Sequence, residues 1–141
     1  EKLYACPEVM EVLNNCDTEV PKMWTDLNTM SKCKGKADIV MKGGTTLVDI
    51  KTTGKDVKDF ERSAYNFDYH RQAAFYMDGF GATEFVFIVI ESNAPHQIGI
   101  FTCSEDFIDK GRQEYIELLE QKQKYCESAE IANSYLIKGE L

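Results

Sequence analysis

The chain has 141 residues, 43% of them hydrophobic, which is enough apolar material to bury one core. No stretch approaches the roughly 20 apolar residues that span a bilayer, and the first residues lack the pattern of a secretory signal, so we expect a cytoplasmic protein with no membrane partner. The net charge of -8 excludes a protein that coats nucleic acid with a uniformly basic surface. The five cysteines include no Cys-x-x-Cys pair, which favours reduced thiols over a zinc or redox site.

The charge is unevenly distributed along the chain. Residues 32–71 carry nine basic and six acidic side chains, whereas the segments on either side of them are acidic. A basic strip on an acidic body is typical of an enzyme that grips phosphates at one place. The strip begins with Lys32, Lys34 and Lys36, which are predicted to contact DNA; the alternative is that they form a solvated strand edge.

The first half of the chain predicts one short helix, starting at Pro7, and an antiparallel meander of three strands. The strands are expected at residues 19–25, 32–41 and 45–52. A turn after the first strand makes a hairpin, and Gly43-Gly44 turns the chain into the third strand, which is rich in β-branched residues.

In the second half the apolar period changes from two to about 3.6, which predicts helices. Helices are expected at residues 57–66, at residues 69–79 and from Ser104 to about Cys126. Residues 85–90 are apolar on both faces and predict a central strand covered on both sides, with residues 97–102 as its partner. The sequence therefore predicts an α/β fold with a central mixed β-sheet flanked by helices.

Side chains two residues apart on a strand share a face, so Asp49 and Lys51 are predicted to point the same way. By the same rule, one face of the preceding strand is expected to carry Lys32, Lys34, Lys36 and Asp38, and the other Cys33, Ala37 and Ile39. A turn at Gly43-Gly44 would bring Asp38 close to Asp49 across the two strands. Two carboxylates and an ammonium group would then converge.

Adjacent carboxylates repel each other unless a cation lies between them. Asp38 and Asp49 are therefore candidate ligands of a divalent metal, and oxygen ligands of this kind suit Mg²⁺ or Mn²⁺. Such a metal would polarise a phosphate, and Lys51 would orient the attacking water or stabilise the developing charge. These three residues thus predict metal-dependent phosphodiester hydrolysis.

Three segments together resemble the exodeoxyribonuclease VIII (RecE-type) branch of the PD-(D/E)XK nuclease superfamily. The segments are Lys34-Gly35-Lys36-Ala37-Asp38, Val48-Asp49-Ile50-Lys51-Thr52-Thr53 and Tyr69-His70-Arg71-Gln72-Ala73-Ala74-Phe75-Tyr76-Met77-Asp78-Gly79. The similarity extends from about Glu19 to Thr102 and is weaker in the final helix. One departure is Ala37, where the family commonly has proline.

The resemblance implies a role for several residues. Asp38, Asp49 and the backbone carbonyl of Ile50 would bind the metal, and Lys51 would be the catalytic lysine. Gln72 and Tyr76 would match the family's Gln-x-x-x-Tyr helix, four residues apart on one face; the alternative for Tyr76 is core packing.

The same resemblance places two more residues, His70 and Arg71, near DNA phosphates; the alternative for His70 is a structural or merely exposed side chain. Family members carry an additional N-terminal region whose acidic residue or histidine completes the metal site. We therefore expect residues 1–141 to be a single nuclease core domain that lacks an N-terminal part of the full family domain. Glu19 is the best substitute for the missing ligand, ahead of Glu8 and Glu11.

The resemblance implies a phage or prophage recombination exonuclease that degrades linear duplex DNA from its ends. Such enzymes commonly form homo-oligomeric rings and act beside a single-strand annealing protein. Two alternatives stay open: an endonuclease that uses the same site, and a catalytically inactive module that binds DNA or protein.

Overall fold

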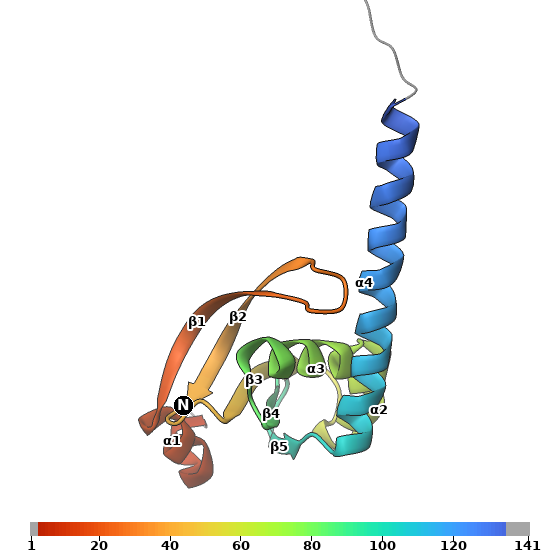
Figure 1. Ribbon diagram of the computed structural model, residues 1–141. Helices are drawn as coiled ribbons and strands as arrows, with labels where there is room; N and C mark the ends of the chain where they lie inside the picture. Colours follow the sequence, from red (N-terminus) through yellow and green to blue (C-terminus); the bar gives the residue numbers. More distant parts are fainter. Residues whose placement is uncertain (1–2, 135–141) are drawn as a thin grey trace, which may run out of the picture.

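The computed structural model describes residues 3–134, with side chains described to residue 128. Its elements are η1 (Leu3–Ala5), α1 (Pro7–Asn14), β1 (Cys16–Thr25), β2 (Lys32–Met41), β3 (Thr46–Thr53), η2 (Val57–Asp59), α2 (Phe60–Asn66), α3 (Tyr69–Phe80), β4 (Glu84–Glu91), β5 (Ile98–Thr102) and α4 (Glu105–Ser134) (Figure 1). No helix within residues 3–134 combines the length and the apolar character needed to cross a membrane.

The strands form one mixed sheet in the order β1-β2-β3-β4-β5. β1, β2 and β3 are antiparallel neighbours, as the meander predicted, whereas β3 and β4 are parallel and β4 and β5 are antiparallel. The crossover between the parallel strands contains α2 and α3, as such a connection requires. The predicted α/β fold, a mixed sheet flanked by helices, is confirmed.

Two apolar cores lie on opposite faces of the sheet. On β4, Phe85, Phe87 and Val89 pack into the core that α2 and α3 cover, and the alternate residue Ile88 packs with Val9 of α1 on the other face. The predicted double coverage of this strand is therefore confirmed. On β3 the same alternation puts Asp49 on the face of α3, because its neighbours Leu47 and Val48 belong to opposite cores.

β2 pairs with β3 only near its C-terminal end, and this separation of the two strands creates the site. The ladder between them consists of two pairs, Ile39 with Val48 and Val40 with Leu47, whereas residues 32–37 pair only with β1. The predicted alternation along β2 is wrong at this point: Ala37 packs in the core under α3, whereas Ile39 packs in the opposite core. The change of face occurs at Asp38, where the β1–β2 ladder is interrupted opposite Glu19, whose backbone lies in the left-handed region at φ 54°.

The β1–β2 hairpin curves over α3 toward α4 (Figure 1). Trp24 anchors it, with its ring centroid 4.8 Å from that of Phe75 and 6.2 Å from that of Phe80. A Cβ on Gly79 would lie 2.4 Å from the indole, so this position of α3 has room only for glycine. The hairpin is thus a rigid ribbon seated on α3.

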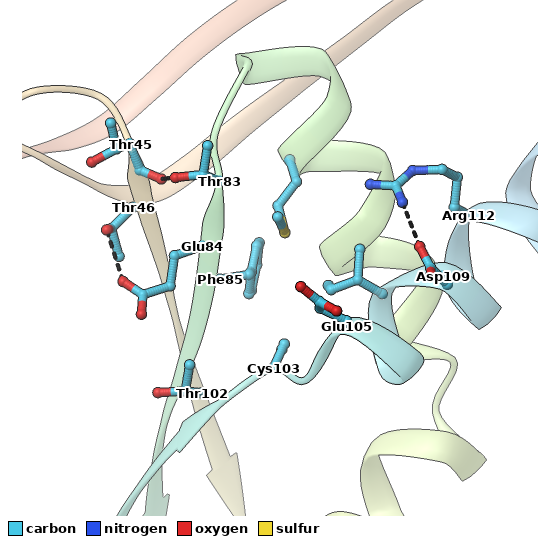
Figure 2. Close-up of a pocket in the computed structure, with 12 residues that line it drawn as sticks. Thr45, Thr46, Thr83, Glu84, Phe85, Thr102, Cys103, Glu105, Asp109 and Arg112 are labelled. Carbon is cyan, nitrogen blue, oxygen red and sulfur yellow. Dashed lines mark hydrogen bonds and ion pairs between the residues drawn. The ribbon is translucent and has the colours of Figure 1, made fainter.

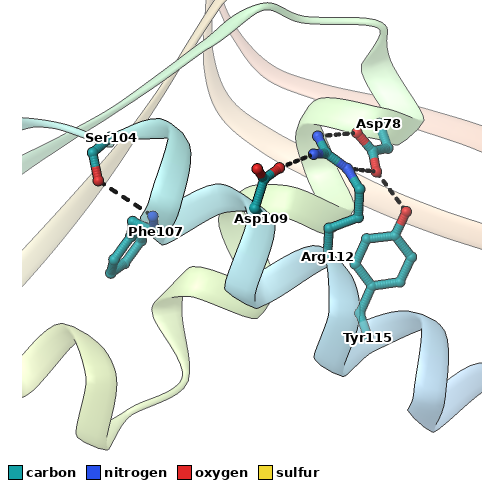
Figure 3. A network of polar contacts seen from close by, with 6 residues as sticks. All are labelled: Asp78, Ser104, Phe107, Asp109, Arg112 and Tyr115. Atoms are coloured by element: carbon teal, nitrogen blue, oxygen red, sulfur yellow. Dashed lines mark hydrogen bonds and ion pairs between the residues drawn. The ribbon is translucent and has the colours of Figure 1, made fainter.

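α4 is fixed to α3 by polar contacts (Figure 3). The Arg112 guanidinium donates to both carboxylate oxygens of Asp78, at 2.8 and 2.9 Å, and to Asp109 at 2.7 Å. The Tyr115 hydroxyl also donates to Asp78, at 2.5 Å. Burial alone would raise the pKa of Asp78, but the bonds from Arg112 and Tyr115 outweigh it and lower that pKa.

Most boundaries lie within one residue of the predicted ones, but two differ by three residues or more. β1 begins at Cys16 rather than Glu19, because residues 16–18 pair with the end of β2 although Asn15 and Asp17 are poor strand formers. α4 continues beyond Cys126 to Ser134.

Candidate nuclease site

Asp49, Lys51 and Gln72 form a closed polar triangle between β3 and α3. The Gln72 side-chain amide donates to Asp49 Oδ1 at 2.9 Å, and its carbonyl oxygen accepts from Lys51 Nζ at 3.0 Å. Lys51 Nζ also lies 2.9 Å from Asp49 Oδ2. Because both ends of the amide are engaged, the orientation of Gln72 is fixed by its partners.

Asp38 reaches the same place from β2. Its Oδ2 accepts a hydrogen bond of 3.1 Å from the backbone N–H of Ile50. The carboxylate takes the place of the ladder partner that Ile50 lost when β2 turned away. The geometry therefore brings together four of the predicted site residues, from two strands and one helix.

Asp49 is the electrostatic centre of this cluster, at 6% exposure. Burial raises the pKa of Asp49, and the charge of Asp38 raises it further, while Lys51 and Gln72 oppose the shift. Cys103, which the sequence analysis did not identify, lies close enough to Asp49 for the charge of Asp49 to affect the pKa of its thiol. Burial, with a smaller contribution from Asp49, raises the pKa of the Cys103 thiol to about 12, so it stays protonated at neutral pH.

The cluster fits a divalent cation. Asp49 Oδ2 is buried, and the Lys51 ammonium group lies beside it as an ion pair. The raised pKa of Asp49 indicates that the present partners do not fully compensate the buried charge. With Asp38 beside it, the site offers the hard oxygen donors that Mg²⁺ and Mn²⁺ take.

The aromatic residues of α3 frame the cluster. Lys51 Nζ lies 4.5 Å from the ring centroid of Tyr69, a cation–π contact that the sequence reasoning missed although Tyr69 opens the helix motif. Tyr76 packs against Gly35, where a Cβ would lie 3.1 Å from its ring, and its ring stacks on Phe80 with centroids 6.0 Å apart. These contacts match the packing role that was the alternative for Tyr76.

The predicted third ligand, Glu19, is exposed on β1 and forms an ion pair with Lys36. Its backbone is in the left-handed region, with φ 54°, a strained conformation for glutamate. The pairs on either side of it place Glu19 opposite Asp38 on the neighbouring strand. Glu19 could join Asp38 at a metal only by releasing Lys36.

His70 and Arg71 lie at the junction of α3 and α4. His70 is 2% exposed, and its Nε2 lies 2.8 Å from Glu114, so it packs the two helices together instead of facing DNA. Arg71 pairs with Asp68 and Glu114. Ligand atoms of Asp68, His70 and Glu114 lie within 4.8 Å of one another, but the Arg71 guanidinium already neutralises both carboxylates and would repel a cation.

A pocket of about 690 Å³ lies elsewhere (Figure 2). It lies at the amino ends of β3 and β4, beside the start of α4, and none of the four cluster residues lines it. Active sites of sheets with parallel strands lie toward the carboxyl ends of the strands. The positions of Asp49 and Lys51 on β3 agree with that rule, so we place the site at the cluster.

Comparisons with known proteins agree with this architecture. Residues 2–134 match the family described as a PDDEXK-like domain of unknown function (DUF3799). A crystal structure from Eubacterium rectale, described as a "putative exonuclease", is 15% identical with a TM-score of 0.68 over 99% of this chain and 59% of that one. The crystal structure of SSO0001 is 20% identical, with a TM-score of 0.51 over 83% of this chain and 57% of that one.

The chain thus spans under three-fifths of the length of either solved structure. A comparison with curated proteins found no match. At these identities the two structures show the fold alone, whereas the family match covers nearly the whole described chain. The chain belongs to the PDDEXK-like domain family of unknown function (DUF3799).

Proposed function

We propose that this protein is a metal-dependent DNA nuclease whose active site is the cluster of Asp38, Asp49, Lys51 and Gln72. The observation that carries the proposal is the convergence of two carboxylates, Asp38 and Asp49, beside the Lys51 ammonium group. Burial and the charge of Asp38 raise the pKa of Asp49 despite Lys51 and Gln72, so a cation between the two carboxylates would be favourable. Membership of a PDDEXK-like family supports the nuclease reading.

The metal ligands in this proposal are Asp38, Asp49 and the backbone carbonyl of Ile50. In an antiparallel ladder the N–H and C=O of one residue face the same neighbouring strand. Since the N–H of Ile50 points to Asp38, its carbonyl faces the same gap between β2 and β3. When bound there, Mg²⁺ or Mn²⁺ would polarise the scissile phosphate and offset its charge. Glu19 would be a further ligand if its pair with Lys36 opened.

Lys51 is proposed to be the catalytic lysine, which orients the attacking water and stabilises the charge that develops on the phosphate. Gln72 holds Lys51 and Asp49 at a fixed separation through its two hydrogen bonds. Tyr69 lies against the ammonium group from the other side. Tyr76 is proposed to shape the wall of the site by seating Gly35 of the hairpin.

DNA would contact Lys32, Lys34 and Lys36 on the hairpin, and Arg71 where it can leave its acidic partners. We leave His70 out of the contact set because it is buried. The resemblance to RecE-type enzymes supports the finer proposal of a recombination exonuclease that acts on linear duplex ends. The ring and the annealing partner implied by that resemblance stay predictions for the whole protein.

The test is single-turnover hydrolysis of an end-labelled linear duplex during a Mg²⁺ or Mn²⁺ titration, with covalently closed circular DNA as the second substrate. Lys51→Ala should lower the rate by about two to three orders of magnitude and leave metal affinity nearly unchanged, because an ammonium group is no metal ligand. Asp49→Ala should abolish both metal binding and cleavage.

A folding defect would damage both functions in both variants, so the contrast isolates the chemistry. Near wild-type cleavage by Lys51→Ala would remove its catalytic role. Cleavage of closed circles at the same rate as linear DNA would favour an endonuclease, and no cleavage together with no metal binding in calorimetry would favour an inactive binding module.

A further inference from the structure

We propose that the outer face of the β1–β2 hairpin is a groove for a single, unpaired strand of DNA. The choice of DNA as the ligand rests on the proposed nuclease function. The groove itself is a shallow surface pocket of about 590 Å³. Its lining residues are Pro21, Lys22, Met23, Lys34, Gly35 and Lys36.

The outer face combines basic and apolar side chains in pairs. Residues directly opposite each other in an antiparallel ladder share a face, and the register puts Lys34 opposite Met23 and Lys36 opposite Pro21. All four side chains are exposed, Met23 to 77%. The apolar character continues at the tip of the hairpin, where Leu27 is 86% exposed.

The contacts that hold the β1–β2 hairpin in place do not involve its outer face. Its inner face packs on α3 through Trp24, and its tip is closed by Asp26, whose carboxylate accepts from the backbone N–H and the hydroxyl of Thr29 at 2.8 and 2.7 Å. The exposed methionine and proline are therefore dispensable for folding. Binding of a ligand at this face therefore costs the protein little conformational entropy.

The charges favour a polyanion over a protein partner of mixed charge. Lys32 and Lys34 make no ion pair with any other described side chain, and Lys36 pairs with Glu19 alone. Lysines two residues apart on a strand are about 6.7 Å apart, so the row extends about 13 Å. The row ends two residues before Asp38, at the edge of the proposed active site.

The apolar partners of the lysines select an unpaired strand. A duplex would offer them phosphates and sugars, because its base faces are stacked inside. A single strand exposes its base faces, which contact apolar side chains while lysines hold the backbone. A row one lysine wide also suits one backbone rather than two. The groove therefore serves the strand that is separated from its complement.

The experiment measures binding of fluorescein-labelled (dT)12 by anisotropy, in EDTA so that no cleavage occurs, over a series of KCl concentrations. A duplex of the same length is the second probe. Met23→Ser should weaken (dT)12 binding about fivefold and duplex binding less than about twofold, without changing the salt slope. Lys34→Ser should weaken both and lower the (dT)12 slope by about 0.7, the value for one phosphate contact of a single strand.

Two exposed residues of α4 provide matched controls, Tyr125→Ser for the apolar change and Lys124→Ser for the charge, and neither should alter binding of (dT)12. Equal effects of Met23→Ser on both probes, or no effect on (dT)12, would overturn the groove. Binding is measured without metal, so the two proposals can fail separately. If the protein cleaves DNA but Met23→Ser does not change (dT)12 binding, the groove is wrong and the nuclease function stands. If the protein binds (dT)12 selectively but never cleaves DNA, only the nuclease function is wrong.

Discussion

Replacing Gly79 by alanine tests whether the hairpin is seated on α3 as described. The added Cβ would lie 2.4, 2.5 and 2.7 Å from three atoms of the Trp24 indole, far inside normal contact distance. Gly79 is buried and helical, so neither backbone can retreat without disturbing the core. The Trp24 indole must therefore move, and β1, which contains Trp24, must move with it.

The expected cost follows from three contributions. Overpacking of a core costs about 1–3 kcal/mol, and displacing Trp24 also weakens its ring contacts with Phe75 and Phe80, worth about 0.5–1.5 kcal/mol each. Alanine in a helix recovers about 1 kcal/mol relative to glycine. The central values give a net loss of unfolding free energy of about 3 kcal/mol, which lowers Tm by roughly 10 °C for a chain of this size.

Urea unfolding of wild type, Gly79→Ala, Trp24→Ala and the double variant measures this loss and its cause. In the Trp24→Ala background the clash is absent, so Gly79→Ala should become stabilising by about 1 kcal/mol through helix propensity alone. The reversal of sign is the diagnostic result. If Gly79→Ala stabilises the chain while Trp24 is present, the indole does not lie against α3 and the hairpin is not seated there.

Three further predictions concern the metal, the glutamine and the helix interface. At a concentration 100-fold above its Kd, Mn²⁺ should stabilise the protein by about 2.7 kcal/mol in thermal melts, and Asp49→Asn should remove that gain; an Mn²⁺-independent Tm would contradict the site. Gln72→Leu removes both hydrogen bonds that position Asp49 and Lys51, so it should lower metal affinity or the single-turnover rate by about 10- to 100-fold. Calorimetry measures the affinity and quenched single-turnover assays the rate; unchanged values would show that Gln72 does not position the two residues. The lowered pKa of Asp78 means that its carboxylate contributes stability that is fully present above the unfolded pKa of about 3.9 and is lost as pH falls through the folded pKa. The destabilisation by Asp78→Asn should therefore be largest at pH 7 and shrink as pH falls below about 3.9; a pH-independent difference in urea midpoints would count against this.

The site explains why the metal and the lysine can share one carboxylate. Asp49 Oδ1 accepts from Gln72, while Oδ2 lies 2.9 Å from Lys51 Nζ. A carboxylate oxygen has two lone pairs, so Oδ2 can bind a cation beside Lys51, whose position Gln72 fixes by accepting from its ammonium group. The preorganisation is carried by α3, so the packing of the hairpin and α4 on that helix supports the site from outside.

Periodicity and turn chemistry were sufficient to predict most elements of the fold. Alternating patterns located β2 and β3, the doubly apolar run located β4, and the change to a period of 3.6 located α2 and α3. The pairing of Asp38 with the Asp49 strand followed from the Gly43-Gly44 turn. These features are local, because side-chain direction and turn geometry depend on residues that are near one another in the chain.

Only the tertiary structure decided where the strands part and what each site residue touches. The change of face at Asp38, which sends Ala37 and Ile39 to opposite cores, accompanies an interruption of the pairing with β1 that no pattern within β2 records. The burial of His70 likewise depends on α4, more than 30 residues away. The residue pattern alone predicted which residues form the proposed site; contacts between distant elements determined their burial, charge partners and orientation, because these depend on packing across the whole fold.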